Sequence, residues 1–182
     1  MDLSENYFAL YQLEPSFDID LAALKVAHRK LQTQCHPDKF SAEGAQQQRL
    51  AVQAMAYVNQ AFETLSVSVK RAEYLLELAG FEANLENKTH QDPVFLMQQM
   101  EWREELSELR QLVASDEAAA EEKLQALYAE QRSLEQKIQA EFVKCYESGD
   151  FSACVAPLAK MHFTTKFAKE LRAAEDELLD LD

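Results

Sequence analysis

Cys35, His36 and Asp38 lie within four positions of one another in the stretch QCHPDKF, residues 34–40. These residue types could supply a nucleophile and its base, or ligands for a metal ion. Adjacent side chains at a helix end diverge, however, whereas a nucleophile needs its base within about 3 Å. Three ligands interrupted by Pro37 do not converge on one ion either. We therefore predict no catalytic residue and no metal site here, which leaves a local Asp/Pro turn or a contact surface for another protein.

A helix must present this cluster, because apolar or buriable residues precede it at steps of three and four positions. They are Leu21, Leu24, His28, Leu31 and Cys35. Asp18 or Asp20 can cap the start of this helix. It must end at Cys35, because the residue before a proline is pushed out of the α region. His36, Pro37 and Asp38 then open a loop that runs through SAEGA, residues 41–45.

Three further helices are predicted around this one. Residues 6–14 form a short helix closed by Pro15, and RAEYLLELAG, residues 71–80, forms another that stops at Gly80. Between the loop and that segment lies a longer helix with one apolar face, the pattern of an antiparallel partner for residues 21–35. Its face is made of Ala51, Met55, Val58, Phe62 and Leu65.

Composition and charge narrow the class of protein. Three Gly and four Pro in 182 residues leave few tight turns and favour an all-α fold. A net charge of −14, from 18 basic and 32 acidic residues, argues against nucleic-acid or membrane-surface partners and favours proteins. No apolar stretch is long enough to span a bilayer and no signal peptide is evident, so we expect a cytoplasmic protein. The three cysteines form no CxxC pair, which favours buried thiols over disulfides or zinc.

The helix before the cluster is the basic part of this acidic chain. Residues 21–40 carry Lys25, Arg29, Lys30 and Lys39 against Asp38, a local charge of four minus one, or +3. Such a surface would steer an acidic partner toward the cluster, with an effect screened over about 10 Å at moderate salt. The alternative is a helix face that is merely solvated.

A second helical region follows a polar connection at residues 80–92. Asp92 and Pro93 are a typical helix start, and one stripe of the following helix can pack into a hydrophobic core. The stripe contains Phe95, Gln99, Trp102, Leu106, Leu109 and Val113. Leu96, Met97 and Met100 lie roughly 100° to 200° away from it, beside Arg103 and Glu104. They form either a partner site, for which flexible methionines are suited, or the second face of a helix buried on two sides.

Two more helices complete the C-terminal region. The first carries an apolar stripe of Leu124, Leu127, Leu134, Ile138, Phe142 and Cys145. After the turn ESGD, residues 147–150, a final helix runs to near Leu181, and Pro157 should kink it or delay its start. Phe163 lies on a plausible core stripe there with Phe167, Leu171 and Leu178. Together these segments predict an antiparallel three-helix bundle over residues 93–182.

The order of these features resembles the J domain of J-type co-chaperones over residues 6 to about 79. The resemblance rests on a basic helix, His36-Pro37-Asp38, an antiparallel helix containing VNQAFETL, and then RAEYLL. With FLMQQMEWREELSEL and the acidic helical C-terminus, nearly the whole chain resembles the HscB-type co-chaperones of bacterial iron-sulfur cluster assembly. The resemblance implies a J domain at residues 1–79, a linker at 80–92 and a client-binding bundle at 93–182.

The resemblance also implies partners and roles. His36, Pro37 and Asp38, with the basic residues Lys25, Arg29, Lys30 and Lys39, would bind an HscA/DnaK-type chaperone and stimulate its ATPase. An IscU-type scaffold would contact Leu96, Met97, Met100, Glu101, Glu104 and Phe163. No cofactor is implied, and the protein itself would hydrolyse nothing. A general J-domain co-chaperone with another client, and a cysteine-dependent enzyme, are the alternatives. Many J domains have Tyr and Lys where Cys35 and Gln34 stand, so the resemblance predicts a narrower choice of chaperone here.

Overall fold

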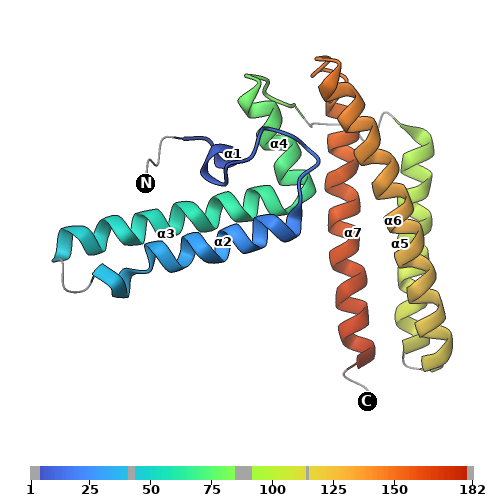
Figure 1. The fold of residues 1–182 in the computed structure, drawn as a ribbon. Helices are drawn as coiled ribbons and strands as arrows, with labels where there is room; N and C mark the ends of the chain where they lie inside the picture. The colour runs from blue at the N-terminus through green and yellow to red at the C-terminus, as the bar shows by residue number, and fades with distance from the viewer. Residues whose placement is uncertain (1–4, 41–43, 85–91, 114, 180–182) are drawn as a thin grey trace. The chain divides into compact units, whose positions relative to one another are not determined.

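The computed structural model describes residues 5–40, 44–84, 92–113 and 115–179. These residues form seven α-helices and one 3-10 helix and contain no strand, so the predicted all-α fold class is confirmed. By its internal contacts the chain divides into two compact units, Met1–Phe81 and Glu82–Asp182. Figure 1 labels the helices of each unit and colours them from blue to red along the chain.

An antiparallel hairpin of α2 (Leu21–Cys35) and α3 (Ala45–Ser66) dominates the N-terminal unit (Figure 1). Asp20 rather than Asp18 caps α2, since its Oδ1 accepts from the amides of Ala22 and Ala23, each at 2.9 Å. Most of the predicted inner faces are buried or partly buried. Leu21 is the exception at 42% exposure, because the first residue of α2 lies beyond the packed part of the hairpin.

Two shorter helices complete this unit. In α1 (Tyr7–Leu10), the amide of Tyr7 donates to the hydroxyl of Tyr74 at 2.9 Å, and the two rings stack at 4.5 Å. Tyr74 belongs to α4 (Ser68–Leu78), so the two helices are joined directly. The predicted stop of α4 is confirmed: Gly80 has φ +74°, and the amide of Phe81 reaches back to the carbonyl of Leu76 at 2.9 Å.

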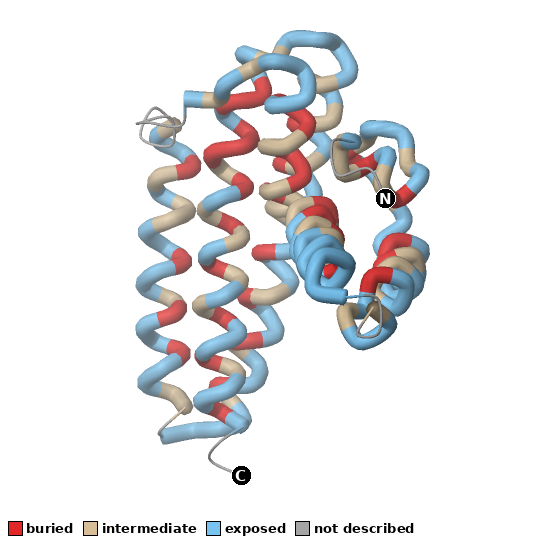
Figure 2. Tube along the Cα trace, turned by 90° about the vertical axis from the view of Figure 1, so that its left-hand side faces the viewer, coloured by how far each residue is buried: buried red, intermediate tan, exposed pale blue. Residues whose placement is uncertain are grey.

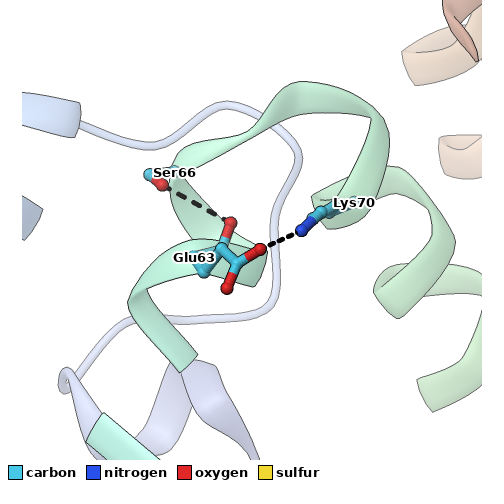
Figure 3. Close-up of polar contacts among 3 residues, drawn as sticks. All are labelled: Glu63, Ser66 and Lys70. Carbon is cyan, nitrogen blue, oxygen red and sulfur yellow. Dashed lines mark hydrogen bonds and ion pairs between the residues drawn. The ribbon is translucent and has the colours of Figure 1, made fainter. Parts of the chain in front are cut away.

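Exposed contacts and buried contacts both stabilise the corner between α3 and α4. Outside, Lys70 pairs with the carboxylate of Glu63, and the hydroxyl of Ser66 donates to the carbonyl of Glu63 at 3.4 Å (Figure 3). Inside, the buried guanidinium of Arg71 donates from Nε to the carbonyl of Phe17 at 2.6 Å and from Nη1 to that of Leu65 at 2.5 Å. Arg71 therefore ties the segment before α2 to the end of α3.

The C-terminal unit is the predicted three-helix bundle. Its helices are α5 (Pro93–Val113), α6 (Glu117–Glu147) and α7 (Val155–Leu179). Buried positions recur along the inner side of each helix, as Figure 2 shows. One cluster of buried hydrophobic residues contains Trp102, Leu106, Leu109, Ala120, Leu124, Leu127, Phe167, Leu171, Ala174 and Leu178. This is the stripe pattern expected from the sequence, so one face of each helix builds the core.

The helices of this unit begin with residues that favour a helix start. Asp92 accepts from the amide of Phe95 at 3.0 Å, and Asp116 accepts from that of Ala119 at 3.1 Å. Pro157 is the third residue of α7, within the first turn, where its missing N–H has no helical partner to lose. In the part of the chain that the structure describes, no helix is long and apolar enough to cross a membrane.

Candidate functional site

The His36-Pro37-Asp38 segment follows the C-terminal end of α2. The helix ends at Cys35 as predicted, and His36 has extended backbone angles, φ −61° and ψ 125°. The predicted loop after Cys35 is wrong in one respect, because Pro37–Phe40 form a 3-10 helix, η1. The amide of Lys39 bonds to the carbonyl of His36 at 3.0 Å and closes this turn. The segment is therefore held by local hydrogen bonds.

The His36 side chain is oriented by its own turn. The amide of Asp38 donates to Nδ1 of His36 at 3.3 Å, and the same Nδ1 lies 3.5 Å from Oδ2 of Asp38. Because Nδ1 accepts from the amide, the proton of a neutral imidazole is on Nε2. The side chains of His36 and Asp38 are 53% and 91% exposed, so both are accessible to another protein.

Cys35 is the last residue of α2 and immediately precedes His36. Its side chain is buried, and burial raises the pKa of its thiol, which opposes formation of the reactive thiolate. The thiol lines a surface cavity of about 410 Å³ beneath the 3-10 helix. The other residues that line it are Gln34, Phe40, Gln47, Leu50, Ala51 and Ala54. Cys35 therefore contributes to packing at this end of the hairpin.

The four predicted basic residues are all exposed. Lys25, Arg29 and Lys30 lie on the outer side of α2, and Lys39 lies on η1 next to the exposed carboxylate of Asp38. Within the described ranges, none of the four side chains makes an ion pair or hydrogen bond. Their charges are thus available to an external partner.

The apolar residues left over on α5 are exposed, as one of the two interpretations requires. Met97 and Met100 are 62% and 64% exposed, while Leu96 is partly buried. Val94, which sequence reasoning missed, is 79% exposed and lies three positions before Met97 on the same side of the helix. We call Val94, Leu96, Met97 and Met100 the α5 patch. Its predicted acidic neighbours, Glu101 and Glu104, are exposed as well.

Phe163 connects this region with the core of the bundle. Its partly buried ring packs edge-on against Phe95 at 5.5 Å and parallel to Trp102 and Phe167 at 6.0 and 6.2 Å. Most of the ring therefore belongs to the core stripe that the sequence also suggested. Its remaining surface is accessible.

The start of α5 is held against α7 by an ion pair. The ammonium group of Lys160 lies 2.7 Å from Oδ2 of Asp92 and 5.4 Å from the centre of the Phe95 ring. The hydrogen bond from Lys160, followed by that from the Phe95 amide, lowers the pKa of the Asp92 carboxyl. The first turn of α5, which carries Val94, is positioned by these contacts.

Two thiols meet where α6 turns into α7. Cys154 is fully buried, and its Sγ donates to the carbonyl of Asp150 at 3.5 Å. Burial, with the nearby thiol of Cys145, raises the pKa of Cys154 to about 12. All three cysteines are free. Among the described residues, no group of three or more His, Cys, Asp or Glu is placed to hold a metal ion.

Comparison with known proteins agrees with this arrangement. Residues 91–172 match a family model described as the HSCB C-terminal oligomerisation domain. The Co-chaperone protein HscB homolog of Shewanella baltica strain OS155 is 39% identical over 96% of this chain and 99% of its own length. Among solved structures, chaperone HscB from Vibrio cholerae is 36% identical with a TM-score of 0.76, over 95% of this chain and 99% of that one.

A more distant structure has the same fold. Human co-chaperone protein HscB is 25% identical, with a TM-score of 0.81 over 96% of this chain and 84% of that one. The Shewanella and Vibrio relatives cover both units of the chain almost completely. By these full-length similarities, the chain belongs to the HscB family of co-chaperones.

Proposed function

We propose that this protein stimulates the ATPase of an HscA/DnaK-type chaperone and delivers to it an IscU-type scaffold on which iron-sulfur clusters are built. The observation that carries the proposal is the exposed His36-Pro37-Asp38 turn beside a basic helix face, in a chain of the HscB family. The role of each surface follows from its chemistry.

The chaperone would dock on the J domain through charge and shape. Lys25, Arg29, Lys30 and Lys39 give an unpaired basic surface that attracts an acidic one, chiefly by raising the association rate. The turn then brings His36 and Asp38 to the partner in a fixed geometry. The J domain would act on the chaperone's own catalytic site, with no hydrolysis by this chain.

The scaffold would dock on the α5 patch. Exposed apolar side chains beside charged ones are typical of protein interaction sites, and methionines adapt their shape to a partner. Glu101 and Glu104 would select for basic groups at the edge of the contact, and the accessible part of Phe163 would extend it. Neither surface requires a cofactor.

A protein that binds both partners raises the local concentration of scaffold at the chaperone. Hydrolysis triggered at that moment would let the chaperone close on the scaffold and promote release of its cluster. This coupling is the physical reason for joining a J domain to a client-binding bundle in one chain.

The test is the steady-state ATPase rate of the cognate chaperone, with and without scaffold, in the presence of the wild type or His36→Gln. We expect stimulation by the wild type, a further increase with scaffold, and loss of both effects in the variant. A chaperone that responds equally to wild type and variant would contradict the role of the turn.

The second candidate is a general J-domain co-chaperone with another client, which the exposed turn alone would also support. The variant Leu96→Ala/Met100→Ala separates the two. Our proposal requires loss of scaffold binding with intact stimulation of the chaperone in the absence of scaffold. The alternative requires that scaffold binding be absent from the start or unchanged by the substitutions.

A further inference from the structure

A groove of about 520 Å³ lies between α5 and α7 on the surface of the C-terminal unit. Its lining is unusually basic for a chain with net charge −14. The basic residues of the lining are Arg103 and Arg110 from α5 and Lys166 from α7. Glu170 is its single acidic residue, so the local charge is three minus one, or +2. The remaining lining residues are Leu106, Ser107 and Gln111.

The cations of this groove lack the close carboxylate partners that two other cations of the bundle have. Lys123 and Lys160 each pair with a carboxylate, at 2.8 and 2.7 Å. Within the described residues, Arg103 and Arg110 make no ion pair or hydrogen bond, and Lys166 lies a distant 3.9 Å from Glu170 with 72% of its side chain exposed. The bundle itself therefore does not explain this concentration of positive charge.

The groove continues the α5 patch along the same helix. Leu96, Met100, Arg103, Ser107 and Arg110 follow one another at steps of four, three, four and three residues, which places them along one face of α5. On α7, Lys166 comes three residues after Phe163, whose ring stacks on Trp102 of α5. A partner seated on Leu96 and Met100 would thus reach the basic groove without leaving this face.

We infer that the groove lined by Arg103, Arg110 and Lys166 binds an acidic segment of the same scaffold that docks on the α5 patch. This inference rests on the proposed function and adds a second, electrostatic half to the client site. Arg103 and Arg110 are seven residues apart, or about 10 Å along the helix axis. One small anion does not span that distance, whereas carboxylates two to four residues apart in an extended chain do.

The experiment measures the affinity of the IscU-type scaffold for the wild type, for Arg110→Glu/Lys166→Glu, and for the control Lys137→Glu/Lys144→Glu. Both control residues are exposed on α6 and outside the groove, and both variants change the net charge equally. We expect about tenfold weaker binding for the groove variant at low salt and less than about twofold for the control. The scaffold affinity of the neutral variant Arg110→Gln/Lys166→Gln should lie between those of the wild type and the charge-reversed groove variant.

The outcomes separate this inference from the proposed function. If Leu96→Ala/Met100→Ala abolishes scaffold binding while the groove variant behaves like its control, the inference is wrong and the proposed function stands. If the wild type does not bind scaffold at all, the proposed function fails and the inference with it. If inorganic phosphate weakens binding more than chloride of equal ionic strength, and only when the groove is intact, the groove is a small-anion site instead.

Discussion

Tyr11 and His28 are joined in the interior of the J domain by a hydrogen bond of 3.0 Å between the phenol oxygen and Nδ1. The same hydroxyl donates its proton to the carbonyl of Val58 at 2.9 Å. A hydroxyl has one proton to give, so Nδ1 of His28 must carry a hydrogen and act as the donor. His28 also stacks on Phe62 at 4.1 Å, which fixes the neutral ring between α2 and α3.

The first prediction concerns the pH dependence of this contact. Burial lowers the pKa of His28 from its usual value, so the folded J domain binds this proton less readily than the unfolded chain does. The stabilisation is fully present above the unfolded pKa of about 6.5 and is lost as the pH falls toward the folded value. Urea unfolding, followed by NMR signals from α2 and α3, should show lower stability at pH 5.5 than at pH 7.5.

The variant His28→Gln provides the comparison, because carboxylates of the domain also titrate on acidification. Its stability should be lower at pH 7.5 and should change less between the two pH values than that of the wild type. Equal pH dependence in the two proteins would contradict a neutral buried His28.

The second prediction concerns Arg71, whose two hydrogen bonds to carbonyls hold the α3–α4 corner against Phe17. We expect Arg71→Met to cost about 3 kcal/mol of J-domain stability, because it removes charge-assisted hydrogen bonds and leaves buried carbonyls without them. Arg71→Lys should restore little, since one ammonium group does not reproduce the forked geometry. Hydrogen exchange measured by mass spectrometry can follow α3 and α4, with α5–α7 as the internal reference.

Lys70→Met is the matched control for this prediction. It removes the neighbouring cation, whose ion pair with Glu63 is exposed, and should cost less than about 1 kcal/mol. If hydrogen exchange in α3 and α4 became faster by a similar factor in both variants, the buried contacts of Arg71 would not be what stabilises the corner.

The third prediction concerns thiol reactivity. With its pKa raised to about 12, Cys154 has about one thiolate in ten thousand molecules at pH 8, and its side chain is buried besides. Iodoacetamide at pH 8 should therefore modify Cys145, which is partly exposed, well before Cys154. Peptide mass spectrometry gives the order, and both should react together in urea. Equal rates in the folded protein would contradict the buried environment of Cys154.

The fourth prediction concerns Gln34, which is exposed in the last turn of α2 beside the turn that carries His36. Gln34→Lys extends the basic face of α2 toward that turn. We expect stronger stimulation of a second DnaK-type chaperone at low salt, with the gain lost at high salt. Gln60→Lys, an exposed change on α3 nearer the other end of the hairpin, should leave both chaperones unaffected.

Sequence reasoning succeeded where local covalent geometry decides. Pro37 ends α2 at Cys35, and Asp92 caps α5, because each effect acts within a few residues. Helical spacing likewise placed Met97 and Met100 on a different face of α5 from the core stripe, because the angle between two residues of a helix follows from their separation in the sequence.

It failed where a contact joins distant residues or where short-range hydrogen bonds order a turn. The 3-10 helix after His36 is one such turn, in which the amide of Lys39 bonds to the carbonyl of His36. In the sequence, Arg71 resembles an ordinary surface cation. Only the folded chain brings the carbonyl of Phe17, which is 54 residues away, within hydrogen-bond distance of its side chain. The basic groove was missed because Lys166 joins Arg103 and Arg110 only when α7 packs beside α5.

The position of Trp102 gives the protein a natural optical reporter. It is the only tryptophan of the chain, its ring stacks on Phe167 at 4.5 Å, and its indole nitrogen donates to Glu130 at 3.3 Å. In the sequence it stands between Met100 and Arg103, where the α5 patch meets the groove. Because this indole is buried in the core, its emission reports on the packing of the C-terminal bundle, whose unfolding can be followed by fluorescence without a label.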